Sequence, residues 1–173
     1  LRERYLHTGS PSDLKKSIEV CQKAVSLAPE GFSGIATLLN NLSLGLRERY
    51  HRTGNLSDLE KAVDGWRSAT NIVPENMPGL HVFFDNLGCG LRARYARTGD
   101  CSDLEEAIEA HYKAVSLTPE GSPDLHGRPS DLGNGLRDRY ILTWDLSDVE
   151  EAINVWRRAV SLTPESSPSY PVV

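Results

Sequence analysis

The sequence predicts an all-α protein, an α-solenoid of antiparallel helix pairs, from two observations: a gapless internal repeat and helical spacing of apolar residues within it. Closely similar phrases of the form LRxRY begin at Leu1, Leu46, Leu91 and Leu136, so the repeat period is 45 residues. Such a period is typical of stacked supersecondary units, because one unit cannot bury its apolar face without a neighbour. We expect about seven helices and part of another at the N-terminus.

The second helix of each unit is predicted by the stretch 102–117, in which Leu104, Ile108 and Val115 recur at helical spacing. A serine followed three residues later by a glutamate predicts a capping box at the start of these helices. The pairs are Ser57/Glu60, Ser102/Glu105 and Ser147/Glu150. A proline ends each helix, because proline cannot continue the backbone hydrogen bonding. These prolines are Pro29, Pro74, Pro119 and Pro164.

The first helix of each unit is predicted by the stretch 80–97, in which Leu87, Leu91 and Tyr95 share one face. A turn at Gly99 follows this helix. The third copy departs from the pattern, because Pro129 falls where the other copies have apolar helical residues. We therefore expect that helix to start late, near Pro129.

The repeat array is expected to occupy residues 1–165, with units starting near 1, 46, 91 and 136, and an extended tail is expected over 166–173. A solenoid needs polar caps at its two ends. Here apolar residues fall at the ends of the array instead, namely Leu1, Tyr5, Val155 and Val160. The sequence therefore predicts self-association through uncapped solenoid ends.

Composition and charge exclude two classes of partner. The 19 Lys and Arg residues are outnumbered by 24 Asp and Glu, for a net charge of −5, whereas nucleic acids and anionic membranes bind basic surfaces. No apolar run approaches the roughly 20 residues that span a bilayer. The three cysteines form no C-x-x-C pair and are too few for a disulfide framework. We expect a cytoplasmic protein that binds neither nucleic acid nor membrane.

No motif for catalysis, metal binding or a cofactor is present, so we expect no enzyme, no metal and no cofactor. The glycines of Gly88-Cys89-Gly90 lie inside a predicted helix, where close helix packing explains them better than a nucleotide loop. His111 occupies the repeat position held by Trp66 and Trp156, so we expect a packed residue and not a ligand.

The units resemble tetratricopeptide repeats, whose pattern places alanine, a large residue, alanine and proline in the second helix. The second copy has this pattern at Ala62, Trp66, Ala69 and Pro74. HEAT and armadillo repeats have similar periods but do not share it. The usual tetratricopeptide period is about 34 residues. The longer units here, with the phrase LNNL at 39–42, are similar to the kinesin light chain variety. The resemblance implies a right-handed superhelix.

The fuller phrases of the repeat, such as SDLEEAI and AVSLTPEGSPD, are similar to long arrays of basidiomycete fungi. Those arrays commonly precede a CHAT domain, a caspase-like protease module. The resemblance implies a protein- or peptide-binding scaffold. Two alternatives stay open: a regulatory or sensor array that controls a separate CHAT effector domain, and a structural spacer or assembly module.

Ligands of tetratricopeptide superhelices bind mainly on the concave side, which the first helices line. With Leu87 and Leu91 turned inward, the 100° step of a helix places Asn86, Cys89 and Arg92 on that side. The expected groove residues are Asn41, Asn86, Asn134, Arg47, Arg92 and Arg137. Amides and guanidinium groups suit the backbone and carboxylates of a peptide. We expect a protein or extended peptide with acidic side chains as the partner.

The arginines have a structural alternative. Arg49, Arg94 and Arg139 are expected to pair with Glu60, Glu105 and Glu150 of the following helix, which is the usual fate of surface charges. For the row that contains Arg47, ligand binding and intramolecular pairing stay equally open.

Overall fold

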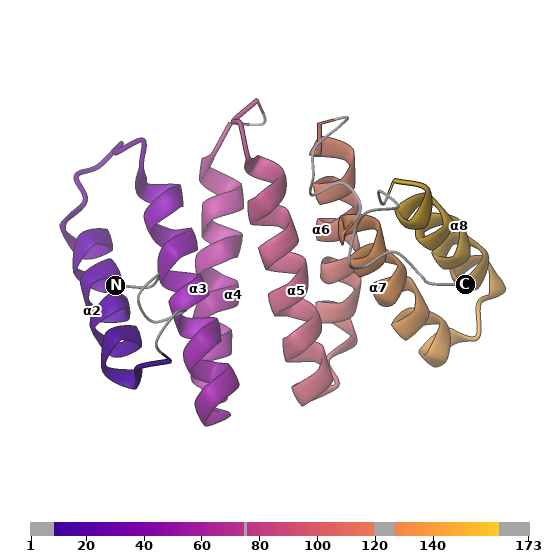
Figure 1. Cartoon of the computed structure of the whole chain (residues 1–173), viewed down its shortest axis with the longest axis horizontal. Helices are drawn as coiled ribbons and strands as arrows, with labels where there is room; N and C mark the ends of the chain where they lie inside the picture. Colours follow the sequence, from indigo (N-terminus) through magenta and orange to yellow (C-terminus); the bar gives the residue numbers. More distant parts are fainter. Residues whose placement is uncertain (1–8, 75, 120–126, 163–173) are drawn as a thin grey trace. The chain divides into compact units, whose positions relative to one another are not determined.

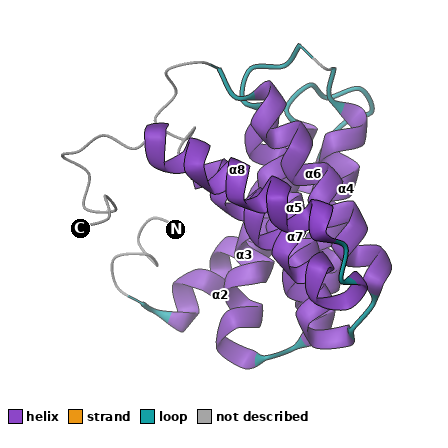
Figure 2. Ribbon diagram, turned by 90° about the vertical axis from the view of Figure 1, so that its right-hand side faces the viewer, coloured by secondary structure: helices purple, strands orange, loops and turns teal. Residues whose placement is uncertain are grey.

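The computed structural model describes residues 9–74, 76–119 and 127–162, with the side chains of 127–129, 159 and 162 excepted. These residues form α-helices joined by loops, and no strand occurs among them (Figures 1 and 2). The seven helices in the described ranges are α2 (Pro11–Leu27), α3 (Ile35–Thr53), α4 (Leu56–Ile72), α5 (Leu80–Thr98), α6 (Cys101–Leu117), α7 (Gly127–Thr143) and α8 (Leu146–Leu162). The all-α prediction is confirmed.

The chain divides into two compact units, residues 1–78 and residues 79–173. The first unit contains α2, α3 and α4, and the second contains α5 to α8 (Figure 1). The most extensive packing within each unit joins α3 to α4, α5 to α6 and α7 to α8, and two-residue links connect the helices of each pair. The predicted tail over 166–173 and the partial helix at the N-terminus fall outside the described residues.

The helix boundaries agree with those expected from periodicity. The stretches 80–97 and 102–117 correspond to α5 and α6. One period after Leu80 falls at residue 80 + 45 = 125, which lies outside the described residues, and α7 is described from Gly127 onward, so the late start of this helix stays a prediction. Pro129 lies within the first turn of α7, where its missing N–H removes no intrahelical hydrogen bond.

The predicted capping boxes are wrong. The residue before the helix caps α4 and α6, because Asn55 and Asp100 accept hydrogen bonds from the backbone N–H groups of Ser57 and Ser102. The oxygen-to-nitrogen distances are 3.1 and 3.0 Å. Each helix therefore begins one residue before the serine, which already lies within it. Bonds from the Ser102 hydroxyl and backbone N–H lower the carboxyl pKa of Asp100.

Each helix pair is held by a large ring on its second helix. In α4, Trp66 is fully buried and its Nε1 donates to Oδ1 of Asn40 in α3 over 3.0 Å. In α6, His111 packs so closely on α5 that a Cβ at Gly88 would lie 2.7 Å from its ring. Gly133 of α7 is in equally close contact with Trp156 of α8. Close helix packing, as expected from the sequence, explains the glycines at both positions.

The turn between the paired helices uses a left-handed residue. Gly54 and Gly99 have φ of 70° and 74°, and their N–H groups bond the carbonyls of Tyr50 and Tyr95. The last pair has Trp144 at the same position, with φ of 57° and the ring 74% exposed. A β-carbon makes this conformation unfavourable, so Trp144 strains the turn.

We predict that Trp144→Gly stabilises the second unit by about 0.5–1.5 kcal/mol, measured by chemical denaturation. Relief of the left-handed strain contributes about 1–2 kcal/mol, and the exposed edge-to-face contact with Tyr140 that is lost offsets about 0.5 kcal/mol of it. Gly99→Ala is the matched control and should destabilise the protein, because φ there is 74°. A less stable Trp144→Gly protein would contradict the strain argument.

Candidate functional site

The two faces of α5 are divided as the helical periodicity predicts. Leu87 and Leu91 are buried at 4% and 0% exposure. Asn86, Cys89 and Arg92 are half-buried on the other face. This second face of α5, together with the facing part of α7, is the candidate binding face of the second unit.

The three expected groove amides lie in different surroundings. Asn41 on α3 is exposed, and Asn134 on α7 is half-buried. Asn86 on α5 is half-buried and already takes part in an interaction within the protein. Their neighbour Asn40 is buried and supports Trp66, so the amides of the LNNL phrase have separate roles.

Arg47 in the first unit has incomplete hydrogen bonding. Its guanidinium lies 5.6 Å from the centroid of the Trp66 ring, in cation–π geometry. Its Nε is buried without a hydrogen-bond partner, and Glu48 approaches another of its nitrogens to only 4.0 Å. A buried donor of this kind is stabilised by any acceptor that reaches it.

Arg92 and Arg137 in the second unit converge on one carboxylate, that of Asp138. The nitrogen-to-oxygen distances are 3.6 Å from Arg92 on α5 and 2.8 Å from Arg137 on α7. Two guanidinium groups therefore share one negative charge. Sequence reasoning missed Asp138. A signal for it was present, because an acidic residue follows the groove arginine in two repeats, as Glu48 after Arg47 and Asp138 after Arg137.

A hollow of about 220 Å³ opens beside this charge cluster. It is lined by Cys89, Arg92, Ala93, Tyr95, Ala96 and Asp138. Its wall combines the guanidinium of Arg92 with small apolar groups and an aromatic ring. The hollow thus offers a cationic group next to an apolar surface.

The second set of arginines is structural, as expected, but the expected partners are wrong. Arg49, Arg94 and Arg139 each form a fork with an aspartate of the following helix, not with the glutamate two residues later. The aspartates are Asp58, Asp103 and Asp148, with nitrogen-to-oxygen distances of 2.5–3.0 Å. These carboxylates are buried, whereas Glu60, Glu105 and Glu150 point outward from the exposed face.

The forks have a clear electrostatic signature. The hydrogen bond to Asp58 raises the pKa of Arg49, and the bond to Asp148 raises that of Arg139. Glu105 also contacts Arg139 at 2.8 Å. This glutamate therefore pairs with the arginine of the following 45-residue repeat and not with Arg94 of its own repeat. The forks tie the paired helices together at their link.

The outer face of α8 carries a second hollow. It has a volume of about 400 Å³ and is lined by Ile153, Trp156, Arg157, Val160 and Ser161. Val160 is 47% exposed and Val155 is half-buried. On α6 the residue equivalent to Ile153 is Ile108, which is buried in the cluster that includes Leu132 and Leu136 of α7. Self-association through this face stays a prediction.

Residues 35–72, which form α3 and α4, match the family model of the tetratricopeptide repeat. This helix pair is a tetratricopeptide repeat. The 45-residue period carries similar residues through the neighbouring units, and this register favours the tetratricopeptide repeat over the HEAT and armadillo alternatives there too.

Solved structures share the tetratricopeptide-type α-solenoid fold. The TPR-like repeats of a kinesin-light-chain-type protein from Podosopora anserina match with a TM-score of 0.67 and 14% identity, over 96% of this chain and 74% of that one. BtubC (BKLC) from P. vanneervenii matches with a TM-score of 0.65 and 19% identity, over 94% of this chain and 64% of that one. No curated protein matches the chain in sequence. The likeness to kinesin-light-chain repeats is confirmed for the fold.

No helix in the described part of this tetratricopeptide array is both long and apolar enough to cross a membrane.

We predict that Asp58→Ala lowers the free energy of unfolding by about 2–3 kcal/mol, because it removes two charge-assisted hydrogen bonds to Arg49 and leaves that guanidinium unpaired. Glu60→Ala removes the same charge at an exposed position two residues later, and it should change the free energy of unfolding by less than about 0.5 kcal/mol. Urea denaturation of both variants measures the difference. Equal losses would restore the glutamate pairing that the sequence suggested.

Proposed function

We propose that this array of tetratricopeptide repeats is a protein- or peptide-binding scaffold without catalytic activity of its own. The partner is an extended segment with acidic side chains or a free carboxylate, and the candidate binding face of the second unit holds one of its acidic groups. The general role as an interaction scaffold is supported by the repeat fold.

The sharing of Asp138 by Arg92 and Arg137 is the observation that carries this proposal. One carboxylate cannot neutralise two guanidinium groups, so this pair of arginines keeps a positive charge that Asp138 leaves unmatched. The surplus is local, because the chain as a whole carries a net charge of −5. A second carboxylate, supplied by a partner, would complete the pairing in the forked geometry that arginine favours.

The size of the hollow favours a side chain over a free small molecule. Its volume of about 220 Å³ lies below the range of about 300–1,000 Å³ that is typical of small-molecule pockets. Tyr95 and the two alanines supply apolar contact for the stem of a side chain, and Arg92 and Asp138 are the charged residues of the lining. A Glu or Asp side chain fits this combination.

The first unit offers a similar arrangement on a smaller scale. Arg47 has a buried Nε with no hydrogen-bond partner, and Asn41, on the same helix, is exposed. An amide can accept from and donate to a peptide backbone, while the guanidinium bonds a carboxylate or carbonyl. We propose the same kind of contact for Asn134 and Arg137 on α7.

We predict that peptides selected by this protein from a random-peptide display library are enriched in Asp and Glu. The Arg92→Ala/Arg137→Ala double variant should bind them at least about tenfold more weakly, because charge-assisted hydrogen bonds contribute about 1.5–3 kcal/mol. Fluorescence polarisation at two salt concentrations measures affinity. The wild-type affinity should fall with salt more steeply than that of the variant.

Two controls accompany this test. Arg97→Ala removes one exposed positive charge from the last turn of α5 and should change affinity by less than about twofold. Far-ultraviolet circular dichroism verifies that the double variant folds. The proposal is wrong if the double variant binds the selected peptides as the wild type does. Selection of no peptide at all would favour the spacer alternative.

A further inference from the structure

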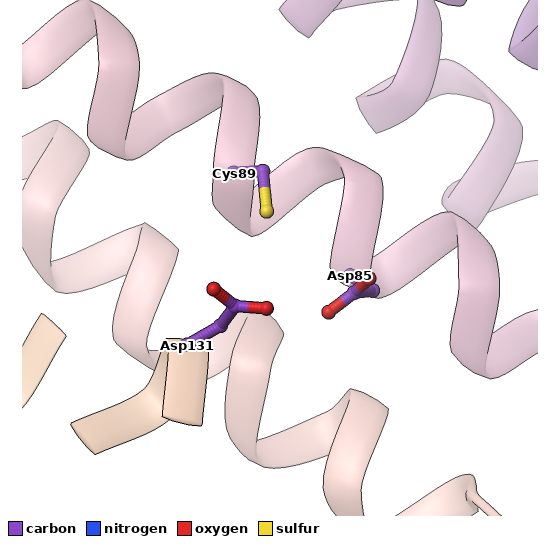
Figure 3. Close-up of side chains that lie close together, drawn as sticks. All are labelled: Asp85, Cys89 and Asp131. Carbon is purple, nitrogen blue, oxygen red and sulfur yellow. The ribbon is translucent and has the colours of Figure 1, made fainter. Parts of the chain in front are cut away.

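Three side chains with metal-binding atoms meet between α5 and α7 of the second unit. They are Asp85 and Cys89, one turn apart on α5, and Asp131 on α7. One ligand atom from each lies within 4.8 Å of the other two, and all three side chains are half-buried (Figure 3). In Figure 3 the sulfur of Cys89 and both carboxylates point into a common space.

A buried histidine faces the same cluster from the core. His111 on α6 is 1% exposed, and neither of its ring nitrogens has a hydrogen-bond partner. Its Nδ1 lies 3.7 Å from Oδ1 of Asp85, which is too long for a direct hydrogen bond. A buried ring with two unsatisfied nitrogens is unfavourable, and coordination of a cation by Nδ1 would remove part of that penalty.

We propose that Asp85, Cys89 and Asp131 bind a zinc ion, and that Nδ1 of His111, which adjoins Asp85 but lies outside the group of three ligand atoms within 4.8 Å, becomes the nitrogen donor when the side chains close around the ion. A thiolate, an imidazole and two carboxylates are a ligand set that suits Zn²⁺. Zinc bonds of about 2.0–2.3 Å in a tetrahedron place neighbouring donors about 3.3–3.8 Å apart. The distance of 3.7 Å between Asp85 and His111 falls in this range.

The other repeats lack this ligand set at the same positions. Counting back 45 residues from Asp85, Cys89 and Asp131 gives Asn40, Leu44 and Asn86. The position of His111 is held by Trp66, whose Nε1 bonds Asn40 and requires no ion. The exchange of Asn and Trp for Asp and His converts a neutral hydrogen-bonded pair into an acid and a base. Four departures from the repeat thus fall on one cluster.

Electrostatics favours a cation in this place. Asp85 and Asp131 bring two carboxylate oxygens within 4.8 Å of each other, and a cation bound between them would reduce the repulsion of these like charges. A divalent ion compensates both charges and favours the thiolate form of Cys89. The ion needs no ligand from the first unit or from the arginines of the candidate binding face.

The test is a titration of the purified full chain with Zn²⁺ by calorimetry and with Co²⁺ by absorption. We expect one ion per chain, and a sulfur-to-cobalt charge-transfer band together with the intense visible bands of tetrahedral cobalt. Cys89→Leu and Asp131→Asn introduce the residues that the preceding repeat tolerates at these positions, so both variants should fold. Cys89→Leu should abolish the charge-transfer band, and Asp131→Asn should weaken zinc binding by at least about tenfold.

Two further variants sharpen the outcome. His111→Trp restores the ring of the neighbouring repeats and should weaken zinc binding by about 10–100-fold. Cys21→Ala, in the first unit, removes a cysteine away from the cluster and should leave the titration unchanged. The proposal is overturned if no ion binds stoichiometrically, or if the cobalt spectrum survives Cys89→Leu. It is also overturned if Asp131→Asn binds zinc as the wild type does.

Discussion

The structure depends on one packing constraint, the contact of a large ring on the second helix of each pair with the helix before it. Gly88 and Gly133 allow that approach, because any β-carbon there would collide with His111 or Trp156. The approach buries Trp66 and His111 fully and Trp156 in part. The residue three positions before the glycine, or its equivalent, lies beside the ring nitrogen in two of the pairs. Asn40 does so for Trp66, and Asp85 faces His111.

The two arginines of each LRxRY phrase have different surroundings. Two residues apart on a helix, they point about 200° away from each other. One of each pair, such as Arg94, forks onto a buried aspartate and fastens the two helices. The other, such as Arg92, is left on the opposite face, where only a shared carboxylate meets it. The local fold therefore pairs one arginine of each phrase within the protein, and we propose that the other is available to a partner.

The proposed ion and the proposed peptide contact lie on the same part of α5. Cys89 contributes to the zinc cluster and also lines the hollow that contains Arg92. A bound cation would add positive charge to that wall and strengthen its attraction for an acidic side chain. The departures from the repeat would then support the same function, because they concentrate charge where the preceding repeat has neutral amides and an indole.

The sequence by itself determined the all-α class, the 45-residue units and the role of the glycines, since periodicity and turn residues express local backbone preferences and packing. The sequence did not identify the correct partner in contacts where several similar residues could pair with the same side chain. Asp58 and Glu60 are both within reach of Arg49, and only the direction of each side chain on the folded helix selects the aspartate. The meeting of Asp85 with Asp131 and the sharing of Asp138 were likewise decided by tertiary structure. These pairs lie up to 46 residues apart in sequence, and only the packing of α5 on α7 brings them together.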